Sequence, residues 1–282
     1  MGFKIMMKKL SVLIVLCVTS FCINISAQAF PANSLRPGGV AVISVAPANQ
    51  TKPFVSYNKK PVALVKGQKN WLAVVGIALK AKSGNHQISI KEASGKMSSK
   101  SFKVKTHQYK TQRLTIKNKN KVNPNKKSSK RIEREYVLKQ KLKKTFSSDS
   151  PKMNFIKPVA GRDSGRFGLR RILNKQKRNP HSGMDIAAPE GKEIKATESG
   201  RIIFVGDLFF TGKVIYLDHG NGLISLYAHL SKTHVKEGQL VNRGDIIARV
   251  GKTGRVTGAH LHWSVYLNGN AVDPALFLKK QK

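Results

Sequence analysis

Short runs of apolar and β-branched residues recur along most of this chain, and clusters of Gly, Asn, Pro or Lys separate them. In the first half, these runs lie at residues 40–45, 53–57, 61–65, 71–79, 87–90 and 102–104. Strands of this length at this spacing are typical of a small β-sandwich. The pattern therefore predicts an N-terminal, sandwich-like β domain at residues 30–109. It holds no cluster of ionisable residues, so we interpret it as a binding or spacer module.

The last part of the chain, residues 151–282, has the same all-β character. Strands are expected at residues 200–205, 213–217, 223–227, 245–250 and 262–267. Strong turn signals lie at Gly220-Asn221-Gly222 and at Asn268-Gly269. No stretch here predicts a helix of convincing length. We therefore expect an antiparallel β domain, and an all-β fold class for the chain as a whole.

The segment between the two domains, residues 110–150, differs from both. Residues 101–150 contain sixteen Lys or Arg and only three acidic residues, and residues 118–130 are almost free of apolar side chains. We interpret this stretch as a solvated basic linker. From Arg131 to about Ser147-Ser148 a single amphipathic helix is expected, because apolar residues recur four apart, at Ile132 and Tyr136 and at Leu138, Leu142 and Phe146. Two interpretations of this helix stay open: a connector packed on a neighbouring domain, or a clamp over a groove.

Composition adds a strong positive charge. The 282 residues carry a formal net charge of +38, and 40% of them are hydrophobic, which is enough for two modest cores. Such a chain is attracted to anionic surfaces, whether nucleic acid, anionic lipid or a carboxylate-rich polymer. A general Lys-rich bias of the genome would produce the same excess, so the charge alone does not select a partner.

Residues 1–29 have the pattern of a secretory signal peptide. A positive start (Lys4, Lys8 and Lys9) precedes a mostly apolar run at residues 10–25, and Ala27-Gln28-Ala29 is a cleavage signal. We expect cleavage after Ala29 and a mature chain beginning at Phe30. The alternative, an uncleaved membrane anchor, is disfavoured because the run falls short of the roughly 20 clean apolar residues that a span needs.

The only two cysteines, Cys17 and Cys22, lie inside this segment. Leu16 and Phe21 precede them, where a lipoprotein signal needs a small residue, so lipid attachment is not expected. The mature chain therefore has no Cys, which excludes disulfides, a thiolate nucleophile and thiolate metal ligands. Its net charge falls to +35 with the loss of three lysines. Export also argues against nucleic acid as the partner.

Six of the eight His residues fall in the last domain, and three short patterns stand out. His260-Leu261-His262 lies on an expected strand, where side chains alternate, so the two imidazoles point to the same face. Paired imidazoles are poor core material and suit one metal ligand and one acid–base group. By the same alternation, Tyr227 and His229 at the end of another strand are expected to share a face.

The third pattern is His181-Ser182-Gly183-Met184-Asp185. Pro180, Gly183 and Pro189 argue against a helix here. On a straight strand, His181 and Asp185 would lie about 13 Å apart, too far to share a metal ion. A turn at Gly183 would bring them together, so the pattern makes sense as a loop folded around a cation.

Taken in order, these patterns resemble the lysostaphin-type (LytM-like) zinc metallopeptidases, which carry an H-x-x-x-D motif, a middle His after a strand and an H-x-H motif. The resemblance covers residues 160–278. Further short segments match the family at Phe167-Gly168-Leu169-Arg170, His219-Gly220, Val235-Lys236-Glu237-Gly238, Arg243-Gly244-Asp245, Gly251-Lys252-Thr253-Gly254 and Val272-Asp273-Pro274. The region from Arg36-Pro37-Gly38-Gly39 to Gln112-Arg113-Leu114 resembles, more loosely, the N-terminal β domain of Gram-negative murein DD-endopeptidases.

The resemblance implies a role for each matching residue. His181, Asp185 and His262 match the family's zinc ligands, and His260 and His229 match its two catalytic histidines. It also implies the lysostaphin-like duplicated hybrid motif as the catalytic fold, Zn²⁺ as cofactor and peptide cross-links of bacterial peptidoglycan as substrate. We favour His260 as general base, although the sequence leaves that assignment open. The remaining histidines, which match no motif, are interpreted as structural or surface groups: His86, His107, His219 and His234.

Two other function classes stay in view. A non-catalytic wall-binding or activator protein could use the same fold, but the complete ligand set argues against it. A sugar-permease phosphocarrier domain also pairs two His, but an export signal and H-x-x-x-D do not suit a cytoplasmic carrier.

Only a short basic tail follows Phe277, so no C-terminal wall-targeting domain of the SH3 type is expected. These features favour D-alanyl–diaminopimelate cross-links in a Gram-negative periplasm, with no stable membrane insertion, and leave the oligomeric state open.

Overall fold

The computed structural model describes residues 31–279. The predicted signal peptide, with Cys17, Cys22 and the cleavage site after Ala29, lies outside these residues. Within residues 31–279, no helix is long and apolar enough to cross a membrane.

The N-terminal β region (residues 31–109) is built from two small sheets that enclose a core. Its strands are β1 (Val40–Pro47), β2 (Phe54–Tyr57), β3 (Lys60–Pro61), β4 (Ala63–Lys66), β5 (Asn70–Gly76), β6 (Gly84–Lys91) and β7 (Met97–Val104). One sheet has the order β1-β5-β4 and the other β3-β2-β6-β7. Side chains from both sheets form one buried apolar cluster, Val75 from β5 and Ile88 from β6 among them. This confirms the sandwich-like arrangement expected from the alternating runs.

The C-terminal β region (residues 151–279) is dominated by a ten-stranded antiparallel sheet, whose main path runs β17-β14-β15-β16-β19-β12-β9. The elements of this region are β9 (Arg162–Gly165), β10 (Arg170–Leu173), β11 (Gln176–Lys177), β12 (Met184–Ala187), β13 (Glu193–Lys195), β14 (Gly200–Leu208), β15 (Gly212–Asp218), β16 (Ile224–Thr233), β17 (Leu240–Val241), β18 (Ile246–Val250), β19 (His260–Leu267), β20 (Asn270–Val272) and the 3-10 helix η2 (Pro274–Phe277). The expected all-β fold class is confirmed.

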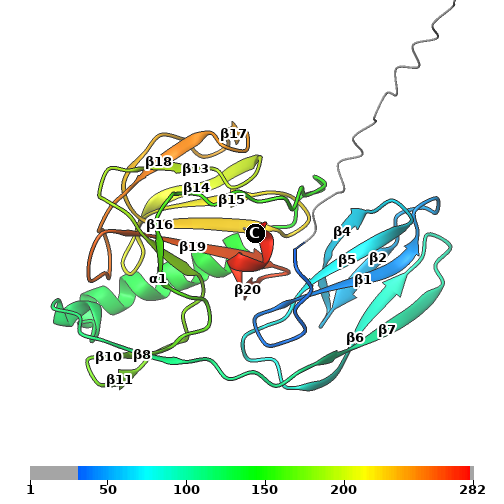
Figure 1. Cartoon of the computed structure of the whole chain (residues 1–282), viewed down its shortest axis with the longest axis horizontal. Coiled ribbons are helices and arrows are strands. Elements are labelled where there is room, and N and C mark those ends of the chain that lie inside the picture. Colours follow the sequence, from blue (N-terminus) through cyan, green and yellow to red (C-terminus); the bar gives the residue numbers. More distant parts are fainter. Residues whose placement is uncertain (1–30, 280–282) are drawn as a thin grey trace, which may run out of the picture.

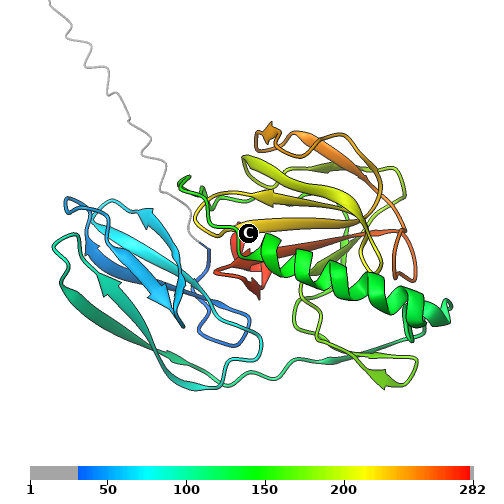
Figure 2. The same cartoon turned by 180° about the vertical axis from the view of Figure 1, so that it is seen from behind.

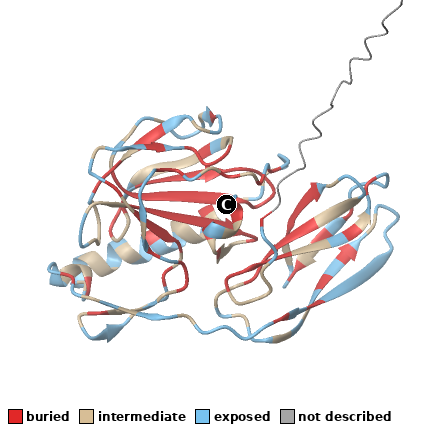
Figure 3. Cartoon of the chain, in the orientation of Figure 1, coloured by how far each residue is buried: buried red, intermediate tan, exposed pale blue. Residues whose placement is uncertain are grey.

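The central strands of this sheet are buried on both faces, as the red colouring of β16 and β19 shows (Figure 3). Alternation along β19 divides its side chains between two cores. Leu261, Trp263 and Val265 belong to the larger cluster on one face. Tyr266 belongs to a second cluster on the other face. Because His262 has the same parity as Tyr266, the polar pair of the H-x-H motif lies on the second face.

The helix α1 (Lys126–Lys143) covers part of that second face, and Figure 2 shows it lying across the sheet. Leu138 and Leu142 pack there against side chains of β14, β15 and β16. The connector interpretation of the helix is therefore the correct one. The helix begins about five residues earlier than expected, because the side chain of Asn125 accepts a hydrogen bond from the Ser128 amide and caps its first turn. It also ends earlier, at Lys143. Tyr136, expected on the packed face, is exposed.

The segment before the helix is more ordered than a solvated linker. Its strand β8 (Thr111–Leu114) pairs in parallel with β10 of the C-terminal β region, and a short 3-10 helix, η1, follows at Lys119–Lys121. Ile116 and Val122 are buried in a small cluster with Leu173. The expectation of a solvated arm was wrong here, because isolated apolar residues in a basic stretch found partners on β10.

The N-terminal β region packs directly on the C-terminal one, and the two lie side by side in Figure 1. Val40, Val65 and Val74 of the sheet β1-β5-β4 belong to the main core of the C-terminal region. The side-chain amide of Asn268 also pairs with both backbone groups of Gly76, accepting from its N–H at 2.7 Å and donating to its carbonyl at 3.1 Å. The two regions therefore share a buried interface. The linker thus joins two regions that are held in contact with each other.

Candidate metal centre

The H-x-H motif and Asp185 meet on neighbouring strands. β12 pairs antiparallel with β19, and their register places Asp185 directly opposite His262. Residues opposite each other in such a pair project to the same face of the sheet. His260, two residues before His262, has its Nε2 3.7 Å from the Asp185 carboxylate. The predicted common orientation of His260 and His262 is confirmed.

His181 reaches the same point from the loop before β12. A bend at Gly183 reverses the chain, so that His181 Nε2 lies 2.9 Å from Asp185 Oδ1. This bend needs glycine, since a Cβ there would lie 2.5 Å from the carbonyl oxygen of Trp263 and 2.8 Å from the ring of His262. The loop folded around one point, expected from the spacing of His181 and Asp185, is confirmed.

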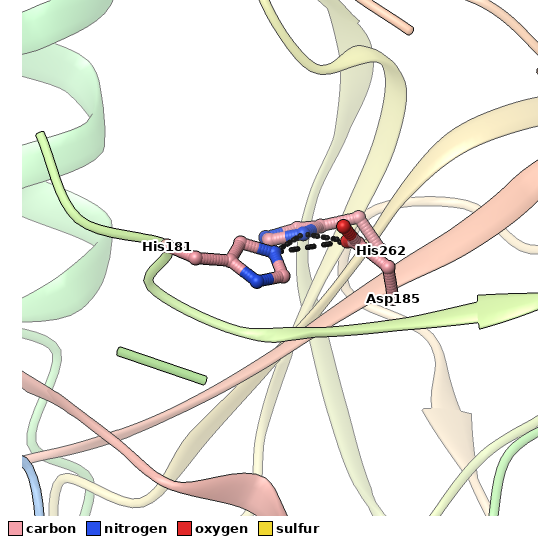
Figure 4. Close-up of side chains that lie close together, drawn as sticks. All are labelled: His181, Asp185 and His262. Carbon is pink, nitrogen blue, oxygen red and sulfur yellow. Dashed lines mark hydrogen bonds and ion pairs between the residues drawn. The ribbon is translucent and has the colours of Figure 1, made fainter. Parts of the chain in front are cut away.

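Three donor atoms converge in the buried centre drawn in Figure 4, namely His181 Nε2, Asp185 Oδ1 and His262 Nδ1. Oδ1 of Asp185 lies 2.8 Å from His262 Nδ1, and the two ring nitrogens are 2.9 Å apart. All three residues are less than 10% exposed. Two imidazoles and one carboxylate, each with a lone pair aimed at one point, form a donor set that fits a divalent metal ion.

Backbone acceptors fix the tautomers of three histidines around this centre. Nδ1 of His181 donates to the carbonyl of Arg166 at 2.8 Å, Nδ1 of His229 to that of Thr253 at 2.8 Å, and Nδ1 of His260 to that of Gly258 at 2.9 Å. Because a carbonyl can only accept, each Nδ1 carries a proton, so that in the neutral ring Nε2 offers the lone pair. His262 is turned the other way, with Nε2 2.9 Å from the Ser264 hydroxyl and Nδ1 toward the centre.

A bulge in β16 directs His229 toward the centre. Its backbone has φ 65°, a left-handed conformation that is uncommon outside glycine, and the pairing with β15 shifts register at this point. Tyr227 points to the opposite face, where its hydroxyl lies 2.8 Å from Thr197 Oγ1. The expectation that Tyr227 and His229 share a face was therefore wrong, because the bulge interrupts the alternation. Strained residues of this kind cluster at functional sites.

His229 and His260 form a second pair of imidazoles beside the three donors. Their ring centroids are 4.8 Å apart, and the rings of His229 and His262 are 5.9 Å apart. The side chain of His260 is 15% exposed, and His229 is more deeply buried. The structure thus brings all five predicted site residues together.

Burial controls the charge of these groups at neutral pH. It lowers the pKa of His262 to about 4, although the neighbouring Asp185 opposes this. It also holds the pKa of His229 well below its ordinary value, helped by repulsion from His262 and His260. Burial alone would raise the pKa of Asp185, but the neighbouring imidazoles of His181 and His262 outweigh it and hold the pKa well below the usual range. An anionic carboxylate beside neutral imidazoles is the protonation state that binds a metal ion.

A cavity of about 270 Å³ opens beside the centre. Asp185, His229 and His260 line it, and so do Arg171 and Arg255, which the sequence reasoning did not single out. Gln112, Leu114 and Ile116 of the linker form part of its wall. In a chain with 52 Lys and Arg residues, no spacing signal distinguishes two functional arginines from the rest.

Comparison with known proteins gives matches in both β regions. Residues 179–274 match the profile of Peptidase family M23, and residues 33–107 match that of the Peptidase family M23 N-terminal domain. A solved structure described as a peptidase M23 from Pseudomonas aeruginosa is 39% identical to this chain. The alignment covers 87% of this chain and 95% of that one, with a TM-score of 0.73.

The chain belongs to peptidase family M23. The lysostaphin-type resemblance seen in its motifs is thereby confirmed, and the protein is a metallopeptidase with a buried His–Asp–His metal site.

Curated relatives of this M23 peptidase match over part of its length. The DD-carboxypeptidase/endopeptidase Mpg of Neisseria meningitidis is 44% identical over 94 residues, which are 33% of this chain and 22% of the relative. The peptidoglycan DD-endopeptidase ShyA of Vibrio cholerae is 39% identical over 113 residues, which are 40% of this chain and 26% of the relative. The matched segments thus span about a quarter or less of these relatives.

The other histidines of the M23 peptidase lie away from the metal site. His219 is buried, with Nδ1 donating to the Ser199 carbonyl at 2.9 Å and Nε2 2.8 Å from the Ser225 hydroxyl. His234 is exposed, and His86 and His107 belong to the N-terminal β region. Their interpretation as structural or surface groups agrees with these positions.

Proposed function

We propose that this M23 peptidase is a zinc-dependent endopeptidase that hydrolyses peptide cross-links of bacterial peptidoglycan during cell-wall remodelling. The observation that supports this most is the convergence of three donor atoms beside two further imidazoles in one cavity. Three protein ligands and an open position form the arrangement of a catalytic zinc site, and sites with two His and one carboxylate are a common form of it. A purely structural site would close the fourth position.

In this proposal, His181, Asp185 and His262 hold the ion. Bound zinc lowers the pKa of a coordinated water toward neutrality and polarises the scissile carbonyl. The surrounding hydrogen bonds, from His181 to Arg166 and between His262 and Ser264, orient the ligands before the ion arrives. The site is therefore preorganised by the fold.

His260 and His229 are proposed as the acid–base groups. His260 is the more accessible of the two, and its Nδ1 is engaged by the Gly258 carbonyl, which leaves Nε2 for the role of general base that takes a proton from the attacking water. His229 would take the other role of the pair, in which it stabilises the oxyanion or protonates the leaving amine. A non-catalytic activator would need neither group.

We further propose the D-alanyl–diaminopimelate bond as the one that is cut. The names of the matched relatives, a DD-carboxypeptidase/endopeptidase and a peptidoglycan DD-endopeptidase, support this choice, although the matches cover only part of those proteins. The strongly basic chain also suits a carboxylate-rich wall, an attraction that salt would weaken.

We also propose export through residues 1–29 and a periplasmic location. The division into a signal peptide (1–29), N-terminal β domain (30–109), basic linker with helix (110–150) and catalytic domain (151–282) remains our working division. The two family matches, at residues 33–107 and 179–274, support it.

The test is digestion of purified diaminopimelate-type peptidoglycan, followed by mass spectrometry of the released peptides. The proposal predicts that new peptide ends are released, that their release stops after chelation, and that it resumes when Zn²⁺ is added. Release of sugar fragments alone, or release that is indifferent to the chelator, would refute it.

A further inference from the structure

Two guanidinium groups share the cavity with the catalytic pair. Arg171 lies on β10, and its Nη2 donates to Asp185 Oδ2 at 2.7 Å. Arg255 lies on the loop between β18 and β19, on the same cavity wall as Gly258 and Ala259. Among the described residues that line this cavity, Asp185 carries the one carboxylate. With a divalent ion bound, the cavity would therefore carry an excess of positive charge.

The donors of Arg171 are only partly used. Its Nε is buried and makes no hydrogen bond within residues 31–279. Gln112, its partner in the β8–β10 register, presents a buried side-chain oxygen that is likewise unpaired there. A buried donor without a partner is costly in a folded protein. The Arg171 Nε–H is therefore available to an acceptor that the chain itself does not supply.

Arg255 is held by packing while some of its donors stay free. Its guanidinium stacks on the ring of Phe210 at 4.4 Å, and Nη1 donates to the carbonyl of Lys121 at 3.3 Å, the one side-chain hydrogen bond that the described residues give it. Burial, with repulsion from Arg171 and Arg178, lowers the pKa of Arg255 to about 10. It stays charged at neutral pH, and a bound anion would relieve the repulsion.

We propose that Arg171 and Arg255 form a carboxylate-binding subsite, which holds the free carboxylate of the residue that supplies the leaving amine. The inference rests on the proposed function and deepens it. Guanidinium groups suit this role because their planar donors match the two oxygens of a carboxylate. The cavity holds about 270 Å³, room for only a residue or two, so a carboxylate bound in it lies next to the scissile bond.

The chemistry of the substrate supports this assignment. In a D-alanyl–diaminopimelate cross-link, the carbon that bears the amide nitrogen also bears a free carboxylate. A terminal D-alanyl–D-alanine bond has the same arrangement. A glycine bridge has no charge at that position. The subsite would therefore favour the D-alanyl–diaminopimelate and D-alanyl–D-alanine bonds over a glycine bridge. It would do so by contacting their carboxylate, and not by sterically excluding the glycine bridge.

The linker has a part in this subsite. β8 pairs with the strand that carries Arg171, and η1 supplies the carbonyl that holds Arg255. Leu114 and Ile116 also line the cavity. The linker is thus a structural component of the specificity site, and α1 fastens its far end to the sheet.

The test uses the zinc-loaded protein and two synthetic cross-linked dimers, which differ only in whether the carboxylate beside the scissile amide is free or amidated. We expect the wild type to cleave the free form with kcat/KM roughly 10- to 100-fold higher, the range for a hydrogen bond to a charged group. Arg255→Gln should lose most of this preference by slowing only the free form.

Arg249→Gln is the matched control. Arg249 is also a partly buried arginine that donates to a backbone carbonyl, that of Gly191 at 2.9 Å, but it does not line the cavity. Its substitution should leave the preference unchanged. Arg171→Gln is less informative on its own, because Arg171 also contacts Asp185. Metal content is therefore measured for every variant, and circular dichroism confirms that each is folded.

Binding of the amine-side product, which retains the carboxylate and has no bond left to cut, separates two kinds of failure. Calorimetric titration compares this product with its amidated form. Equal binding of the two forms, or an Arg255→Gln variant with the wild-type preference, would overturn the subsite. A retained binding preference without cleavage of either dimer would overturn the proposed function and leave the subsite standing.

Discussion

The imidazole rings of His229 and His260 lie next to each other in the lining of the cavity, with their centroids 4.8 Å apart. They come from β16 and β19, two strands that are paired in the sheet, and only the bulge at His229 allows them to meet. In each ring Nδ1 donates to a backbone carbonyl, which leaves Nε2 for the proposed acid–base role. This arrangement supports the proposal that the two imidazoles are acid–base groups beside a metal site.

Removal of a metal ligand should abolish both metal binding and turnover. In His262→Ala, one of three donors is lost and Asp185 loses a hydrogen-bond partner at 2.8 Å. We expect the zinc content, measured by elemental analysis, to fall from one ion per chain to near zero. Full zinc occupancy in this variant would show that the assigned ligand set is wrong.

Removal of either acid–base group should separate catalysis from metal binding. His260→Ala and His229→Ala are expected to retain zinc and to lose turnover by about 10²- to 10⁴-fold, the usual contribution of such groups. His234→Ala, at an exposed histidine outside the cavity, is the control and should behave as wild type. A His229→Ala variant that digests peptidoglycan at the wild-type rate would remove His229 from the mechanism.

The bend that joins His181 to Asp185 should tolerate no side chain at Gly183. A Cβ there would meet the Trp263 carbonyl and the Ser264 hydroxyl, both at 2.5 Å. We expect Gly183→Ala to lower the free energy of unfolding by roughly 1–3 kcal/mol, as overpacking does, and to weaken zinc binding. Ser182→Ala is the control, because that side chain makes no hydrogen bond within residues 31–279. Wild-type zinc affinity in Gly183→Ala would contradict this account of the bend.

Stability should fall in mild acid because His219 is buried in its neutral form. Burial lowers its pKa from 6.5 to about 4 in the folded chain. Between these values the unfolded chain binds the extra proton more readily, so the stabilisation is complete above pH 6.5 and is lost as the pH falls toward 4. This site can contribute up to roughly 3 kcal/mol to that change.

Urea unfolding of the chelated protein from pH 4 to 7 measures this effect, with His219→Gln as the comparison. The substitution should flatten the pH dependence without abolishing it, because burial lowers the pKa of His262 and His229 in the same direction. An identical pH dependence in the variant would show that His219 is not responsible.

Local sequence patterns predicted the fold class and identified the five candidate site residues. The features that the sequence did not predict depend on long-range contacts. Alternation placed His260 and His262 correctly, because β19 is a regular strand buried on both faces. It failed at His229, where a bulge adds one residue to β16. A bulge is set by its partner strands, so the local sequence does not reveal it.

The linker shows the same limit. Leu114, Ile116 and Val122 are scattered among lysines, and no period marks them as buried. They are ordered because β10 offers an unpaired edge to β8, more than fifty residues away in sequence. Arg171 and Arg255 were missed for a related reason, since their role depends on the cavity that this pairing closes.

The most direct test of the account is to incubate the mature, zinc-loaded enzyme with purified diaminopimelate cross-linked dimers and, separately, with pentaglycine-bridged wall. Mass spectrometry then identifies the bond that is cut. The account predicts monomers with a new D-alanine carboxyl end from the dimers, little release from the glycine-bridged wall, and no cleavage by His262→Ala. Release from the glycine-bridged wall alone, with the dimers left intact, would contradict it.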